Sequence, residues 1–312
     1  MNILVTIPHY FNPRPGGRNA SLRADAGARA DALKSVILSL HENFGNLQAT
    51  MDQRTAELSR LAAARGNNVR IIVVTTQRSN HVLDPLAGLS HLFLHVMPDD
   101  PDYDPRYLGI KCREVQGHAF QKTGEGFDFY CYLEDDGIIH DPWFFEKLRF
   151  FNSKFGNECL LLPARYEVES SGWLFGKRPN PPGAKLYPEG DLPETVTLGY
   201  PLGRGRDAPD EVALEAMGRT VRFRRPLNPH AGCYFLNPAQ MKAFLETPYF
   251  LERSSGFMGP LESAATLGIL KRFVLYKPHP DNLAFFELQH YHPGTLGRAT
   301  VKVEPAPNRG AP

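Results

Sequence analysis

Short apolar runs alternate with segments of helical periodicity through the first half of the chain, and this order constrains the fold more than any other feature. Residues 3–7 form an apolar run that ends at Pro8, a pattern typical of a buried strand. From about residue 28, apolar side chains recur at three- and four-residue spacing as far as Phe44, which predicts an amphipathic helix. Repeated units of this kind predict an α/β fold with a Rossmann-like, mostly parallel central sheet flanked by helices.

The same reasoning assigns the remaining elements and one irregular region. We expect further strands at residues 69–75, 92–96, 127–133, 159–162, 231–236 and 273–276. We expect further helices at residues 48–64, 105–122, 238–246 and 261–270, and a helix opened by Asp141 and Pro142. The chain has 27 prolines and 27 glycines, and many of them gather between residues 172 and 229, where no periodicity is visible. This pattern predicts a single domain with a long irregular insertion.

Charge, cysteine and hydropathy patterns exclude several classes of protein. Lys and Arg number 35 and Asp and Glu 34, so the basic excess expected of a nucleic-acid-binding protein is missing. The four cysteines lie far apart, without the spacing of a zinc site or a disulfide framework. We find no signal-peptide pattern and no apolar stretch of transmembrane length, so we expect a cytoplasmic protein for which peripheral membrane contact stays open.

An acidic triplet, Glu134-Asp135-Asp136, directly follows the apolar run at residues 127–133 and precedes Gly137. In open α/β sheets, ligands bind at the carboxyl ends of the strands. Adjacent carboxylates repel one another unless a positive charge lies among them, and Mg²⁺ or Mn²⁺ prefers oxygen ligands of this kind. The triplet therefore predicts a metal site, and the alternative is a plain acidic turn.

Four motifs in their order along the chain resemble the nucleotide-sugar glycosyltransferases of the GT-A fold. The triplet is similar to that family's D-x-D motif, with Glu134 in the first place. The opening strand with Thr6, Ile7 and Pro8 is similar to the donor-nucleotide edge of the fold. Residues 231–236, followed by a helix, and residues 259–263 also look like the family. The resemblance covers most of the chain apart from the insertion.

The resemblance implies roles for the motif residues. Asp136 would bind an Mn²⁺ or Mg²⁺ ion that bridges the diphosphate of a nucleotide-sugar donor, while Glu134 and Asp135 would contact the ribose or the waters of the metal. Glu262 lies where inverting members carry a catalytic base, which would take a proton from the acceptor hydroxyl. The alternative for Glu262 is a glutamate that only favours the first turn of a helix.

The resemblance also divides the chain by function. Residues 1–165 would form the half that binds nucleotide sugar and metal, residues 166–230 an insertion on the acceptor side, and residues 231–312 the acceptor-binding and C-terminal part. The acceptor would be a saccharide or a lipid-linked sugar.

Further donor-binding candidates follow the first strand or precede the triplet. Pro8, His9 and Tyr10 lie at the expected donor edge. Arg14 and Lys111 are cations that complement the donor's phosphates, although a solvent-exposed helix face is the alternative for Lys111.

Histidines near the end of the chain are candidate metal ligands. A late histidine binds metal in some GT-A members, and imidazole is a ligand that Mn²⁺ accepts. His290 and His292 would lie on the same side of an extended strand, so both could approach one site. The alternative is a histidine that is solvated or packed in the core.

Acceptor-binding candidates lie in the predicted insertion. Trp173 follows Gly172 and could stack on a sugar ring. Arg222 and Arg224 belong to a basic cluster that could bind an acidic acceptor, and the alternative is a charged strand edge in solvent.

Glu262 favours an inverting glycosyltransferase reaction, and two other functions stay open beside it. A nucleotidyltransferase that makes nucleotide sugars would need a glycine-rich basic loop after the first strand, of which residues 15–18 are only a faint version. A carbohydrate-binding protein would keep the fold without turnover. The chain has no P-loop, dinucleotide-binding or zinc-protease motif.

Overall fold

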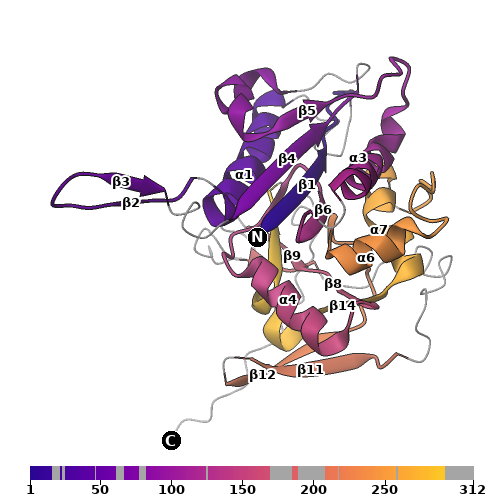
Figure 1. The fold of residues 1–312 in the computed structure, drawn as a ribbon. Coiled ribbons are helices and arrows are strands. Elements are labelled where there is room, and N and C mark those ends of the chain that lie inside the picture. The colour runs from indigo at the N-terminus through magenta and orange to yellow at the C-terminus, as the bar shows by residue number, and fades with distance from the viewer. Residues whose placement is uncertain are drawn as a thin grey trace, which may run out of the picture.

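The computed structural model describes most of the residues of the chain (Figure 1). These are residues 1–15, 22, 25–45, 47–60, 67–76, 82–123, 126–168, 185–188, 208–216, 218–257 and 259–291. Two predicted site residues, Trp173 and His292, lie outside the described residues, as does most of the predicted insertion.

The central sheet has five strands in the order β13-β6-β1-β4-β5. Their bounds are β1 Asn2–Pro8, β4 Asn68–Val74, β5 Leu94–Val96, β6 Phe129–Leu133 and β13 Cys233–Leu236. Strands β6, β1, β4 and β5 run parallel, and β13 is antiparallel to β6. Both faces of β1 and β6 are buried, which explains why their sequences are continuously apolar rather than alternating. The predicted α/β fold with a mostly parallel sheet is confirmed.

Helices cover both faces of this sheet, as Figure 1 shows for α1 and α3. The helices are α1 Ala26–Phe44, α3 Leu108–Thr123, α4 Phe144–Phe155, α6 Pro238–Leu245 and α7 Pro260–Arg272, with shorter 3₁₀ segments η2 Asp84–Leu92, η3 Pro105–Tyr107 and η4 Pro280–Phe285. Helix α6 begins at a capping box formed by Asn237 and Gln240. Helix α4 begins slightly later than predicted, because Asp141 Oδ1 accepts from the Trp143 N–H at 2.9 Å in a preceding turn.

Two smaller sheets join distant parts of the chain. One has the order β10-β9-β15-β7, formed by β7 Gly137–Ile138, β9 Ala164–Val168, β10 Lys185–Leu186 and β15 Glu287–His290. The other has the order β11-β12-β14-β8, formed by β8 Cys159–Leu161, β11 Glu211–Ala216, β12 Arg219–Arg224 and β14 Val274–Pro278. Because β15 lies between β9 and β7, the late part of the chain returns to the acidic triplet.

Aromatic side chains of α4 connect the central sheet to its neighbours. The Phe144 ring lies 4.9 Å from Phe235 on β13, and the Phe145 ring lies 4.8 Å from Phe129 on β6. At the other end of the helix, the Phe151 ring lies 5.1 Å from Phe223 on β12. The apolar face of α4 is therefore shared between two sheets, which makes one continuous core.

The structure corrects three predictions. The helix expected at residues 48–64 is wrong, since β2 Ala49–Met51 and β3 Leu58–Arg60 form an antiparallel hairpin that projects from the body in Figure 1. The region expected to be irregular contains the regular hairpin β11–β12. Strand β12 lies between β11 and β14, so its arginines do not protect a sheet edge, and β11 is the edge strand instead.

Candidate functional site

Polar residues gather where β1 and β6, neighbours in the sheet, both end. His9 follows β1 and the acidic triplet follows β6. His9 Nδ1 lies 2.6 Å from Asp135 Oδ2, and both side chains are buried. The Val82 N–H donates to His9 Nε2 at 3.3 Å, so Nδ1 carries the proton and donates to Asp135. His9, which directly follows β1, therefore holds the Asp135 carboxylate in place.

Arg29 on α1 supplies the cation that the triplet requires. Its Nη2 forms an ion pair with Asp135 Oδ1, and its Nη1 lies 3.5 Å from Asp136 Oδ2. The Arg29 side chain is only 4% exposed, so both interactions lie in a low-dielectric environment. Sequence patterns did not single out Arg29, because one arginine in an amphipathic helix looks like a solvent-exposed residue.

His290 on β15 connects Asp136 to a second buried carboxylate. Its Nε2 lies 3.4 Å from Asp136 Oδ2, and its Nδ1 lies 3.3 Å from Glu167 Oε1 on β9. The Tyr291 N–H donates to the Asp136 carbonyl at 2.8 Å, which holds β15 against the triplet. Burial alone would lower the pKa of His290, but the Asp136 and Glu167 carboxylates outweigh it and raise that pKa to about 9.

Glu134 and Glu262 bring two further carboxyl groups to the same place. Burial, the Glu262 charge and the Asp136 charge raise the pKa of Glu134 to about 8. Glu134 Oε1 is buried without a hydrogen-bond partner among the described residues. Burial also raises the pKa of Glu262, with the charge of Asp136 acting in the same direction and Arg165 opposing it.

Two glycines leave room for these carboxyl groups. Gly232 has a φ of +67°, and a Cβ there would lie 2.8 Å from Glu134 Oε2. A Cβ at Gly259 would overlap Glu262 Oε2, so the Glu262 carboxylate folds back over its own helix N-terminus. Both glycines belong to the stretches at residues 231–236 and 259–263 that carry the family resemblance, and close approach of a carboxylate is the physical reason for them.

Cationic and imidazole groups line the other side of the cluster. Arg165 on β9 lies with Nη1 3.2 Å from His230 Nε2, and Lys277 on β14 donates to the His230 carbonyl at 2.9 Å. Burial and the charges of Arg165 and Lys277 lower the pKa of His230 well below its ordinary value, so His230 stays neutral. Arg165, His230 and Glu167 were missed at the sequence level, because each is a single polar residue whose contacts depend on strands far apart in the chain.

Asp136 and His290 are the two side chains of this cluster that could act as ligands of a divalent cation. Asp136 Oδ2 and His290 Nε2 lie 3.4 Å apart as an ion pair, so the imidazole would bind a metal ion only after losing its proton. No group of three or more His, Cys, Asp and Glu side chains that could hold a metal occurs among the described residues. A cation held by this pair would need further oxygen ligands from a bound diphosphate, which is the usual arrangement for Mg²⁺ at phosphate substrates.

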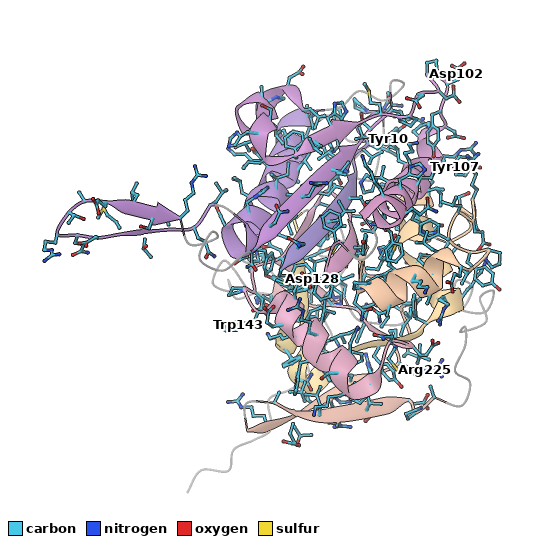
Figure 2. All side chains as sticks on the ribbon, in the orientation of Figure 1. Tyr10, Asp102, Tyr107, Asp128, Trp143 and Arg225 are labelled. Atoms are coloured by element: carbon cyan, nitrogen blue, oxygen red, sulfur yellow. The ribbon has the colours of Figure 1, made fainter. Side chains whose placement is uncertain are left out.

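The other predicted site residues fall into two groups. Pro8 is buried at the end of β1, and Tyr10 follows it, with its hydroxyl accepting from Asn12 Nδ2 at 3.0 Å; Figure 2 shows Tyr10 near the upper end of that strand. Arg14 is exposed beyond them. Lys111 on α3 forms an ion pair with Glu114 at 3.0 Å, the arrangement of an ordinary helix surface pair.

The predicted acceptor arginines lie outside this cluster. Arg222 on β12 pairs with Glu211 at 2.6 Å and with Asp281 at 3.0 Å, and Arg224 lies on the same strand. Figure 2 shows the neighbouring Arg225 in the lower part of the molecule, at the opposite end from Tyr10. The structure therefore brings together His9, Glu134, Asp135, Asp136, Glu262 and His290, and leaves Lys111, Arg222 and Arg224 in surface ion pairs or on a separate sheet.

Comparisons with known proteins give a distant likeness of fold. No protein-family model matches the chain, and no curated protein matches it. The fold is similar to that of S. aureus TarS, a GT-A-type glycosyltransferase, at a TM-score of 0.43 and 11% identity over 95% of this chain. A structure of TarS 1-349 in complex with UDP-GlcNAc gives a TM-score of 0.40 and 9% identity over 96% of this chain.

The chain spans only part of these proteins, 38% of the longer TarS chain and 62% of the shorter one. It is also similar to a CMP:2-keto-3-deoxy-manno-octonic acid synthetase complexed with CTP, at a TM-score of 0.36 and 11% identity over 94% of this chain and 92% of that one. These likenesses concern the fold alone.

Among the described residues, no helix is both long and apolar enough to cross a membrane.

Proposed function

We propose that this chain is a glycosyltransferase that moves a sugar from a nucleotide-sugar donor to a saccharide or lipid-linked acceptor, with inversion at the anomeric carbon. The observation that supports it best is the group of carboxyl side chains and His290 at the carboxyl ends of β1 and β6. Ligands of open α/β sheets bind at this edge. His9, Tyr10 and the triplet are proposed to line the donor, because they follow the two central strands.

Glu262 is proposed as the general base. Burial raises the pKa of its carboxyl group, which makes its carboxylate a stronger proton acceptor. It takes the proton of an acceptor hydroxyl while that oxygen forms a bond to the anomeric carbon. The bond from that carbon to the diphosphate oxygen breaks, and its electron pair leaves with the nucleoside diphosphate. The proton stays on Glu262 until it passes to solvent.

Asp136 and His290 are proposed to hold an Mn²⁺ or Mg²⁺ ion. The ion, when bound, supplies positive charge beside the leaving diphosphate. Arg29, which pairs with Asp135 and lies near Asp136, offsets the repulsion between the two carboxylates and orients them. Glu167 faces the other nitrogen of His290 and favours the orientation in which Nε2 points toward Asp136.

The experiment measures release of nucleoside diphosphate from a panel of nucleotide sugars, with and without Mn²⁺ or Mg²⁺. We expect metal-stimulated turnover with at least one donor, abolished by Asp136→Asn and reduced about 100-fold or more by Glu262→Gln. Arg222→Gln, which changes a surface ion pair far from the triplet, is the control and should keep wild-type turnover.

Two results would overturn the proposal. Release of pyrophosphate from a nucleoside triphosphate and a sugar phosphate would identify a nucleotidyltransferase instead. Binding of saccharides with no turnover of any donor, and no metal-dependent binding of nucleoside diphosphates by calorimetry, would identify a non-catalytic carbohydrate-binding protein.

A further inference from the structure

Arg113 on α3 carries a guanidinium group that is buried in an unusual setting. The residue is 1% exposed, and among the described residues its charge has no carboxylate partner. It donates instead to the carbonyls of Tyr249 at 3.3 Å, Phe250 at 3.1 Å and Ala264, and it lies 5.3 Å from the centroid of the Phe244 ring. Burying a cation without an opposite charge is costly, so an apolar side chain would serve packing alone better.

The three carbonyls belong to two different segments. Tyr249 and Phe250 lie between α6 and α7, and Ala264 lies in the first turns of α7. One guanidinium therefore connects α3 both to the segment that precedes α7 and to the first turns of α7. Helix α7 is shaped for this contact, since a Cβ at Gly268 would lie 3.0 Å from Arg113 Nη1 and 2.8 Å from Phe244.

The position of the Glu262 carboxylate depends on the beginning of the same helix. Glu262 is two residues before Ala264, and its carboxylate accepts a hydrogen bond from its own backbone N–H. It also lies against Gly259, the residue that caps α7. Because the carboxylate is held by the backbone of the first turn, it moves when that turn moves.

We propose that Arg113 is a positioning residue for Glu262, because its guanidinium fixes the beginning of α7 and so holds the carboxylate against the acceptor hydroxyl. This inference rests on the proposed function, in which Glu262 is the base. The planar guanidinium reaches carbonyls of two segments at once from one rigid group. A lysine ammonium at position 113 is a single point charge and cannot reproduce that geometry.

The test compares the variants Arg113→Lys and Arg113→Met with Leu148→Ala, a core truncation in α4 away from α7. All are assayed in the full chain at a temperature where circular dichroism shows each to be folded. We expect both Arg113 variants to lower kcat about 10- to 100-fold, the effect of misplacing a catalytic group by about 1 Å, with the donor KM within about twofold. Leu148→Ala should keep kcat within about twofold, although it weakens the fold.

A double-mutant cycle separates positioning from general loosening. In a Glu262→Gln background there is no base to position, so Arg113→Met should lower the remaining kcat no further. The inference is overturned if Arg113→Met keeps the wild-type kcat, or if it lowers kcat by the same factor in both backgrounds.

A readout independent of turnover distinguishes this inference from the proposed function. If Glu262→Gln keeps the wild-type rate, the assignment of the base is wrong whatever Arg113 does. The carboxyl ¹³C resonance of Glu262 still reports its surroundings in that case. We expect Arg113→Met to shift this resonance and Leu148→Ala to leave it in place, and an unchanged resonance in Arg113→Met would overturn the positioning role.

Discussion

Glu262 and Gly259 show how one missing side chain places a reactive group. The Glu262 carboxylate occupies the space that a Cβ of Gly259 would fill. Gly259 has an extended backbone that an alanine adopts without strain, so the contact with Glu262, rather than the backbone, requires the glycine.

Gly259→Ala should therefore displace the carboxylate and keep the fold. We expect kcat to fall about 10-fold or more, because the base loses its position. The free energy of unfolding should change by about 1 kcal/mol or less, the usual range for a helix cap. Steady-state kinetics and urea unfolding measure the two effects. Gly88→Ala is the control, since nothing lies within 4 Å of a Cβ there, and an unchanged kcat in Gly259→Ala would contradict the prediction.

The Arg29→Met variant should have a lower free energy of unfolding than the wild type, because the buried Asp135 carboxylate loses its guanidinium partner. Breaking a buried ion pair by removing one partner costs about 3–5 kcal/mol, and we expect a loss near the lower limit, since His9 still donates to Asp135. Urea unfolding gives the value. Arg106→Met removes an exposed pair with Asp104 and should change stability far less; equal losses in both variants would refute the importance of burial.

His230 should make stability depend on pH. Its pKa in the folded chain is well below the ordinary 6.5, so below about pH 6.5 the unfolded chain takes up a proton that the folded chain does not. The contribution of neutral His230 to the free energy of unfolding is complete above about pH 6.5 and is lost as the pH falls. Between about pH 6.5 and pH 5, the free energy of unfolding should fall more steeply in the wild type than in His230→Gln, by up to about 1.4 kcal/mol per pH unit. Urea unfolding across this range tests it, and parallel curves would contradict it.

At the scale of elements, β15 is the strand on which the site depends most. It pairs with β7 on one side and β9 on the other, and it carries His290 to Asp136. A strand with partners on both sides has no tolerance for proline, which lacks the N–H that the ladder requires.

Gln289→Pro should consequently destabilise the fold, whereas Ser59→Pro in the exposed hairpin strand β3 should not. Gln289 is opposite Ile138 and Tyr166, and an unsatisfied buried backbone group costs about 1–3 kcal/mol before any steric clash is counted. Thermal unfolding followed by circular dichroism compares the two variants. Equal midpoints in both would show that β15 is not an integral strand.

At the scale of the whole molecule, the hairpin β2–β3 lies apart from the core. Every residue from Ala49 to Arg60 is exposed, and Figure 1 shows the hairpin projecting from the body. Replacing residues 49–60 by a short Gly-Ser linker should therefore shift the thermal midpoint by no more than about 2 °C, as differential scanning calorimetry would show. By contrast, Phe223→Ala in the hairpin β11–β12 removes a buried ring and should lower the free energy of unfolding by about 3–5 kcal/mol. An equal fall in the thermal midpoint from both changes would show that the two hairpins do not differ in their contribution to stability.

The sequence predicted the parts of the molecule whose signals are local. The runs that became β1, β4 and β6 are apolar throughout because both faces of these strands are buried, and the triplet is visible because it interrupts such a run. The hairpin at residues 49–60 was predicted as a helix because its composition favours helices and no neighbour in the sequence opposes that choice.

The unpredicted parts depend on contacts between distant segments. Strands β7, β9 and β15 have two to five residues each, too few for a period to show, and they pair only across long separations. Arg29 and Glu167 were not predicted as site residues for the same reason. Each contacts the site from an element whose position in the fold no local sequence pattern indicates.

The late position of β15 has a consequence for the order in which the site is made. Because synthesis runs from the N-terminus, His9 and the acidic triplet leave the ribosome long before His290 is made. Until then Asp136 and Glu167 lack their imidazole neighbour, and β9 lacks β15 as a neighbouring strand. The site is completed only once His290 has been added, so a translation product that ends before His290 contains the acidic triplet but cannot assemble the group of side chains around it.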